Sequence, residues 1–271
     1  MKKNKIYDCI TFFNENLLTN LRFEILNEVV DFFVICESRY DHMGNKKKLN
    51  FNLLNDKFKN KIRYIIIEEQ FPDTANGWEN EKFQREKLFD GLKDAESDDY
   101  IIYSDSDEIP DPKKLKNIKL ENKYGIFLQK FFVYKLNIFN KYETPWEGSR
   151  ICKKKYLKSF TFLRKKILKK NLKKSFWKIH IEKNIYLIEN GGWHFNNLYP
   201  IDIISQKLKV FPHREFSSPK FYDHEVIKKK ISNLEDLFGR GHKYKKINID
   251  QTYPEFLKKN LAYFKDYILE Q

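Results

Sequence analysis

The sequence lacks long apolar runs and has few cysteines, which membrane-spanning and disulfide-stabilised proteins need. Its longest apolar runs, such as residues 64–67, are far too short to cross a bilayer. The three cysteines are scattered and none forms a CxxC pair, so neither a disulfide framework nor a thiolate zinc site is expected. The basic N-terminus leads into an apolar run that carries Asp8 and has no small-residue cleavage site. We therefore expect a cytoplasmic protein without a signal peptide or transmembrane segment.

Arginine is also scarce. Of the 52 basic residues only 8 are arginine and 44 are lysine, and the formal net charge is +14. Proteins that read nucleic acids rely on arginine forks, so no nucleic-acid partner is expected. A coding sequence poor in G and C accounts for much of the lysine, together with the abundant Asn, Ile, Phe and Tyr. The alternative is a real anionic partner, such as a phosphorylated donor, an anionic lipid surface or nucleic acid.

Hydrophobic patterning predicts an α/β fold. Apolar runs at residues 5–13, 31–37, 61–67 and 100–104 predict buried strands, and residues 15–28, 51–60 and 78–95 between them predict helices. This alternation favours a mostly parallel, Rossmann-type sheet with helices on both faces. Later segments at 126–136 and 185–187 are strand-like, and the tail predicts two helices around a glycine-rich turn. We expect one α/β domain over residues 1–222, with a helical extension over 223–271 packed on it.

The most informative motif is an acidic turn. Asp105 and Asp107 directly follow the predicted strand at residues 100–104, and Pro110 turns the chain away. Parallel sheets bind ligands at the carboxyl ends of their strands. Two carboxylates at positions i and i+2 can both reach one Mn²⁺ or Mg²⁺ ion and leave positions open for phosphate oxygens. The alternative is an acidic turn that caps the next helix.

A second motif is the run Gly-Gly-Trp-His-Phe at residues 191–195. Paired glycines permit close backbone approach or a positive φ angle. The Trp-His pair beside them is typical of a loop that faces a sugar or a metal. His194 is therefore the predicted third metal ligand, and a structural histidine is the alternative.

These motifs occur in the order seen in a known family. The stretches concerned are Asn14-Glu15, residues 31–37 leading to Gly44 and 48–51, residues 78–85, residues 98–110 and residues 191–195. Together they resemble glycosyltransferase family 17. The run Asp-Asp-x-Ile-Ile-x-x-Asp-x-Asp-Glu-Ile-Pro carries most of the resemblance. It implies a GT-A fold, an inverting mechanism, a UDP-sugar donor (UDP-GlcNAc by analogy), Mn²⁺ or Mg²⁺, and a metal-binding Asp105-x-Asp107. We expect this chain to lack the membrane anchor and stem of the animal members, so a lipid-linked or surface glycan is the expected acceptor.

We also expect a donor-binding set, in which some residues lie near the strand ends and others lie in the loops and helices between them. It consists of Asn14, Glu15, Glu37, Lys48, Trp78, Arg85 and Asp105. The first three are predicted to contact the uridine and ribose, and the two basic residues to contact phosphates. Glu37 could equally cap a loop. Arg85 could equally pair with Glu81, one helical turn away.

A general base must be a carboxylate within hydrogen-bond reach of the acceptor hydroxyl. Glu215 is the first candidate, because it follows the Trp-His motif and lies among aromatic residues that could stack on sugar rings. Glu147, in the run Pro-Trp-Glu-Gly, is the second.

The basic segment at residues 164–178 is a further motif. Its apolar residues, which are Ile167, Leu168, Leu172, Phe176 and Trp177, predict a partial apolar face lying on an anionic membrane, or else a solvated insertion. Two other functions remain open at this stage. A nucleotidyltransferase or phosphatase could also place Asp-x-Asp after a strand, although no glycine-rich phosphate loop is present. A nucleic-acid-binding protein would leave the acidic turn unexplained.

Overall fold

The computed structural model describes residues 3–72, 76–209 and 219–270. The chain forms two compact units. Unit 1 comprises Met1–Gln129 and Glu147–Gly192, and unit 2 comprises Lys130–Trp146 and Trp193–Gln271. The division falls within strand β6 (Tyr124–Val133). The expected extension at residues 223–271 lies within unit 2.

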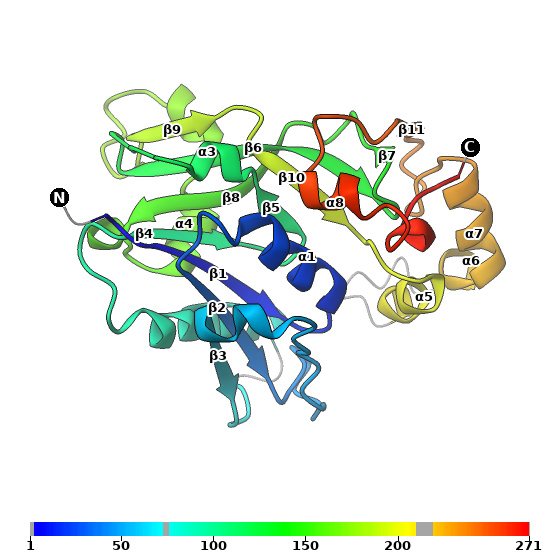
Figure 1. The fold of residues 1–271 in the computed structure, drawn as a ribbon, viewed down its shortest axis with the longest axis horizontal. Helices are drawn as coiled ribbons and strands as arrows, with labels where there is room; N and C mark the ends of the chain where they lie inside the picture. Colours follow the sequence, from blue (N-terminus) through cyan, green and yellow to red (C-terminus); the bar gives the residue numbers. More distant parts are fainter. Residues whose placement is uncertain (1–2, 73–75, 210–218, 271) are drawn as a thin grey trace. The chain divides into compact units, whose positions relative to one another are not determined.

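Unit 1 is built on a mixed, mostly parallel sheet, as the sequence predicts (Figure 1). Its strands are β1 (Ile6–Phe12), β2 (Phe32–Ser38), β3 (Ile62–Ile67), β4 (Tyr100–Ser104), β5 (Glu108–Pro110), the first part of β6, β8 (Trp146–Lys153) and β9 (Ile185–Ile188). The order across the sheet is β6-β8-β4-β1-β2-β3. Strand β1 pairs in parallel with β2 and β4, and β2 pairs in parallel with β3, whereas β8 is antiparallel to β4.

Helices cover both faces of this sheet. They are α1 (Asn16–Leu26), α2 (Gly77–Glu86), α3 (Pro112–Leu115) and α4 (Phe160–Lys166), with 3-10 turns η1 (Asp56–Lys61), η2 (Lys87–Leu92), η3 (Lys154–Tyr156) and η4 (Lys169–Lys173). Side chains alternate along a strand. On one face Phe33 packs against Phe23 of α1 and Phe58 of η1. On the other, its neighbour Val34 packs in a cluster with Leu88 of η2 and further residues of α4.

Two predicted helices differ from the structure. Residues 51–55 have no regular structure, and residues 56–60 belong to the 3-10 turn η1. Two asparagine side chains of α1 hold this stretch: Asn16 accepts from the Asn52 amide and Asn20 from the Leu54 amide. Such side-chain bonds compete with helical ones. The predicted helix at 78–95 is divided into α2 and the tighter turn η2.

Unit 2 is mixed α/β. It contains the end of β6, β7 (Ile138–Phe139), β10 (Gly192–Asn196), α5 (Ile201–Lys209), α6 (Pro219–Tyr222), α7 (His224–Ser232), β11 (Lys245–Lys246), α8 (Glu255–Lys259) and η6 (Lys265–Tyr267). Strand β7 is antiparallel to both β6 and β11. The core joins Phe131 and Val133 of β6 to Ile227 and Ile231 of α7. Among the described residues of the whole chain, no helix has the length and apolar character that a bilayer span requires.

Candidate active site

The acidic turn lies at the carboxyl edge of the parallel strands in unit 1. Ser104, the last residue of β4, is level with Ile10 of β1, and Phe12 of β1 is level with Glu37 of β2. Asp105 and Asp107 therefore leave the sheet at the edge where ligands bind to folds of this kind. The Asp105 side chain is 38% exposed.

A buried arginine of α1 braces both ends of this turn. Arg22 is fully buried and forms an ion pair with Asp8 in the middle of β1. The same guanidinium donates to Ser104 Oγ at 2.7 Å and to the Glu108 carbonyl at 2.6 Å. Ser104 Oγ in turn donates to Ser149 Oγ of β8 at 2.7 Å. The residues before and after the acidic turn are thus fixed to the sheet core.

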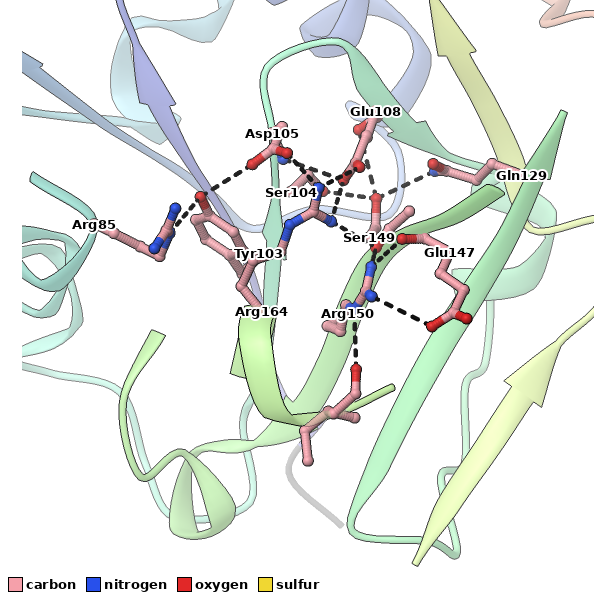
Figure 2. A network of polar contacts seen from close by, with 12 residues as sticks. Arg85, Tyr103, Ser104, Asp105, Glu108, Gln129, Glu147, Ser149, Arg150 and Arg164 are labelled. Carbon is pink, nitrogen blue, oxygen red and sulfur yellow. Dashed lines mark hydrogen bonds and ion pairs between the residues drawn. The ribbon is translucent and has the colours of Figure 1, made fainter. Parts of the chain in front are cut away.

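A second arginine lies on the carboxylates themselves (Figure 2). Arg164 of α4 contacts Asp105 Oδ2 and donates to Glu108 Oε1 at 2.9 Å. Burial alone would lower the pKa of Arg164, but the charges of Asp105 and Glu108 outweigh it and raise the pKa. The guanidinium therefore stays charged, with only 12% of its side chain exposed. It places a fixed positive charge beside the acidic turn.

Local capping explains the position of α4. The Ser159 side chain caps the helix by accepting from the Phe162 amide at 2.9 Å. The Glu86 carboxylate at the end of α2 accepts from the Phe160 and Thr161 amides at 3.1 and 2.7 Å. A carboxylate also complements the positive end of the helix. These contacts anchor the helix that carries Arg164.

Arg85 reaches Asp105 through a tyrosine. Its Nε donates to the Tyr103 hydroxyl at 3.0 Å, and that hydroxyl donates to Asp105 Oδ1 at 3.2 Å. Arg85 also donates to Glu81 Oε1 at 2.5 Å, which is the i,i+4 pair anticipated as its alternative. Only 1% of Arg85 is exposed, so Arg85 supports the position of Asp105 from within the core, through Tyr103. Its predicted phosphate contact stays a prediction.

Glu147, the second candidate base, belongs to the same network (Figure 2). Its Oε2 accepts from the Lys169 amide at 2.9 Å and lies 3.7 Å from the Arg150 guanidinium. Burial and the nearby charge of Arg164 lower the pKa of Arg150 to about 10. The side chain of Glu147 is 33% exposed and so is open to solvent while held in place.

The residues predicted to contact the nucleotide at the ends of β1 and β2 are connected through Asn50. The Asn50 side chain donates to the Phe13 carbonyl, and the Asn50 amide donates to Glu37 Oε1. The buried Glu37 carboxylate also accepts from Lys47, from the Phe51 amide and from the Tyr64 hydroxyl. Glu37 therefore acts as the loop cap anticipated as its alternative.

The other donor-binding candidates occupy varied environments. Glu15 accepts from the Phe13 and Asn14 amides at 2.9 and 3.1 Å. Lys48 is exposed. Trp78, at the start of α2, is 63% exposed, and the Lys165 ammonium of α4 lies 5.6 Å from its ring centroid. The Trp78 side chain is therefore largely open to solvent.

The Gly-Gly-Trp-His-Phe motif was wrongly predicted to be a loop. Residues Gly192–Asn196 form β10, and His194 is level with Phe131 of β6. Trp193 and His194 are 5% and 4% exposed, and the His194 ring packs on Phe131 and Trp146. An aromatic run fits a buried strand better than a loop. His194 lies in unit 2 and the two aspartates in unit 1, so its metal role stays a prediction.

The paired glycines do allow close approach, as predicted. Gly192 has a φ of 130°, and a Cβ there would lie 2.2 Å from the Ile109 carbonyl of β5. The Gly191 carbonyl accepts from the Asp111 amide at 2.9 Å. The glycines therefore fix the strand that leaves the acidic turn.

The two carboxylates, Asp105 and Asp107, suit a divalent cation, and Arg164 lies beside one of them. Mg²⁺ is commonly held by one or two carboxylates plus substrate phosphates, so Asp105 and Asp107 would suffice. Arg164 already contacts Asp105, so an ion would share that carboxylate with the guanidinium. Within residues 3–72, 76–209 and 219–270, no three Asp, Glu, His or Cys side chains form a group that could hold a metal. Glu215 lies outside the described residues.

Comparison with known families agrees with this architecture. The model of glycosyltransferase family 17 matches residues 1–247. The chain belongs to glycosyltransferase family 17. Family membership makes it a glycosyltransferase, which favours sugar transfer over the nucleotidyltransferase, phosphatase and nucleic-acid-binding alternatives.

Curated relatives include the beta-1,4-mannosyl-glycoprotein 4-beta-N-acetylglucosaminyltransferases of Rattus norvegicus and Homo sapiens. Each is 33% identical to this family 17 chain over 117 residues. The match covers 39% of this chain and 22% of each relative.

Two solved structures show limited similarity to the chain. One is glucosyl-3-phosphoglycerate synthase from Mycobacterium tuberculosis, with 11% identity, a TM-score of 0.36, and coverage of 74% of this chain and 75% of that one. Another is a glycosyltransferase involved in glycosylation of the major capsid of PBCV-1, with 14% identity, a TM-score of 0.33, and coverage of 68% and 81%. With such low TM-scores, the family assignment of this chain depends on the family match.

Four residues of the site were missed from the sequence alone. Asp8 and Arg22 carry a signal, because each is a charged residue within an otherwise apolar strand or helix face, and buried charges need partners. Arg164 was grouped with the basic surface segment, although it is the single arginine among its lysines. Ser149 carried no signal that sets it apart from other serines.

Proposed function

We propose that the chain transfers GlcNAc from UDP-GlcNAc to a glycan hydroxyl, with inversion at the anomeric carbon and with the help of Mn²⁺ or Mg²⁺. The observation that carries this proposal is the acidic turn after β4, braced by Arg22 and contacted by Arg164. Membership of family 17 supports the reaction class. The names of the rat and human relatives support GlcNAc as the sugar and a glycan as the acceptor, which we propose is either free or lipid-linked.

A divalent cation held by Asp107, with Asp105, would supply positive charge beside the donor diphosphate. Arg164 adds a second, permanent positive charge at the same turn. Charge that develops on the leaving diphosphate is best stabilised by groups already in position, because they need not reorganise during the reaction. The exposed face of Trp78 would stack on the donor or the acceptor.

The acceptor proton must go to a carboxylate as the new bond to the anomeric carbon forms and the bond to the diphosphate breaks. Glu147 is the candidate among the described residues, because it is partly exposed and held by the Lys169 amide. Glu215 is the other. The replacements Glu147→Gln and Glu215→Gln distinguish the two candidates. The variant that lacks the true base should lose turnover by at least about 100-fold and keep its affinity for UDP. Full turnover in both variants would remove both residues from the mechanism.

The deciding experiment is calorimetry of nucleotides and nucleotide sugars, with and without Mn²⁺. We expect metal-dependent binding of UDP and UDP-GlcNAc that is lost in Asp107→Ala. The matched control is Asp98→Ala, an exposed aspartate two residues before β4, at its amino end, which pairs with Lys153 and Lys155. Unchanged UDP binding in Asp107→Ala, or binding without any metal, would contradict the proposed site.

A further inference from the structure

A second surface of unit 1 exposes three large apolar side chains. Phe176, Trp177 and Ile179 are 70%, 77% and 91% exposed, in the connection between η4 and β9. The rings of Phe176 and Trp177 pack on each other with centroids 4.2 Å apart. Contiguous apolar groups left in water mark a contact surface. We call residues 176–179 the apolar tip.

A lysine-rich stretch without acidic residues leads into the apolar tip. Residues 165–178 contain seven lysines, which are Lys165, Lys166, Lys169, Lys170, Lys173, Lys174 and Lys178. Six of them are exposed and Lys169 is partly so. The adjacent Arg164 is directed instead at Asp105 and Glu108. The exposed positive charge of this surface therefore comes from lysine alone.

The apolar tip is not the amphipathic face predicted from the sequence. Ile167 is fully buried in the core of unit 1, and the segment is divided into α4, η4 and a final turn. That turn is closed by the Lys178 amide bonding to the Ser175 carbonyl at 3.1 Å and by the Ile179 amide bonding to the Trp177 carbonyl at 2.9 Å. These backbone bonds hold the three apolar side chains together in one short turn.

We propose that the apolar tip inserts into the surface of an anionic lipid bilayer, with the lysines of residues 165–178 on the lipid headgroups. Tryptophan and phenylalanine partition into the interface between headgroups and acyl chains, and lysines add electrostatic attraction to anionic lipid. A nucleic acid fits less well: Ile179 has no ring to stack on a base, and no arginine fork is exposed in this segment. The proposal does not depend on the identity of the sugar donor.

The test is co-sedimentation of the full chain with vesicles of phosphatidylcholine alone, or with roughly one-third phosphatidylglycerol. We expect pelleting with the anionic vesicles only. The variant Phe176→Ser/Trp177→Ser/Ile179→Ser should bind at least about tenfold more weakly. The variant Lys170→Gln/Lys173→Gln/Lys174→Gln should also lose affinity, by up to about fivefold per lysine.

Control variants change other exposed groups elsewhere in unit 1. They are Met43→Ser/Leu54→Ser for the apolar residues and Lys113→Gln/Lys114→Gln/Lys116→Gln for the charges. Both controls should pellet like the unmodified chain. The proposal is overturned if the chain does not pellet, if the apolar variant pellets normally, or if single-stranded RNA binds through these residues and vesicles do not. Circular dichroism of each variant establishes that it is folded.

Discussion

Arg164 forms a fork on Glu108: its Nη2 lies 2.9 Å from Oε1 and its Nη1 lies 3.3 Å from Oε2. The Glu108 side chain is completely buried. A buried carboxylate is tolerated only when a partner compensates its charge. The same guanidinium also contacts Asp105, so the stability of unit 1 and the position of a predicted metal ligand depend on one side chain.

Replacing Arg164 by methionine should therefore destabilise the protein by about 3 kcal/mol, because the buried Glu108 carboxylate loses its ion pair with Arg164. Adding Glu108→Gln should restore most of that loss. Sugar transfer should stay low in both variants, since Asp105 has lost its contact with Arg164. Urea unfolding and a UDP-release assay measure the two effects. Equal stability of the single and double variants would argue against this pairing.

The pair Asp8–Arg22 offers a second test. Arg22→Met should cost about 3–5 kcal/mol, and the double variant Asp8→Leu/Arg22→Met should recover much of it. UDP binding should not recover, because Ser104 and the Glu108 carbonyl still lack their donor. Arg39→Met is the control for stability: Arg39 pairs with Glu68 and both side chains are exposed, so its effect should be below about 1 kcal/mol. Recovery of binding together with stability would show that Arg22 has no positioning role.

Asp236 in unit 2 is expected to cause part of the loss of folding stability at low pH. Burial alone would raise the pKa of this carboxyl, but hydrogen bonds from Arg240 and Tyr244 outweigh it and lower the pKa to about 2. A depressed pKa adds stability that is present above the unfolded value, near 3.8, and is lost as the pH falls through about 2. Asp236→Asn should thus cost about 2 kcal/mol near neutral pH and little near pH 2.

Urea midpoints between about pH 2 and pH 7 measure this difference. The exposed Asp266→Asn is the matched control and should follow the unmodified chain at every pH. A constant gap between Asp236→Asn and the unmodified chain would mean that the carboxylate charge is not the stabilising feature.

Strand positions in the first half of the chain were predictable because apolar runs there are bounded by polar loops. The edge of the sheet that carries Asp105 and Asp107 followed from the parallel connections. What failed was local: residues 51–55 look helical, but Asn16 and Asn20 bond to the backbone there. Such long-range competition leaves no periodic signal in a sequence.

The partners of the acidic turn were harder to predict than the turn itself. Arg164 is 56 residues beyond Glu108, inside a segment whose net charge suggested a surface role. Charge counts cannot separate the arginine that is turned inward from the lysines that are turned outward. The prediction of a loop at the Trp-His motif was wrong for a related reason, because an aromatic pair beside glycines also occurs in buried strands.

Gly192 gives the site a dependence that charge-removal mutagenesis would not detect. A single methyl group at this position would meet the Ile109 carbonyl and the Asp111 amide of the chain leaving the acidic turn. It would change no charge and remove no side-chain hydrogen bond, and yet it would force a shift in the backbone that follows the acidic turn. The geometry of the turn is thus set partly by the absence of a side chain eighty-five residues away from Asp107.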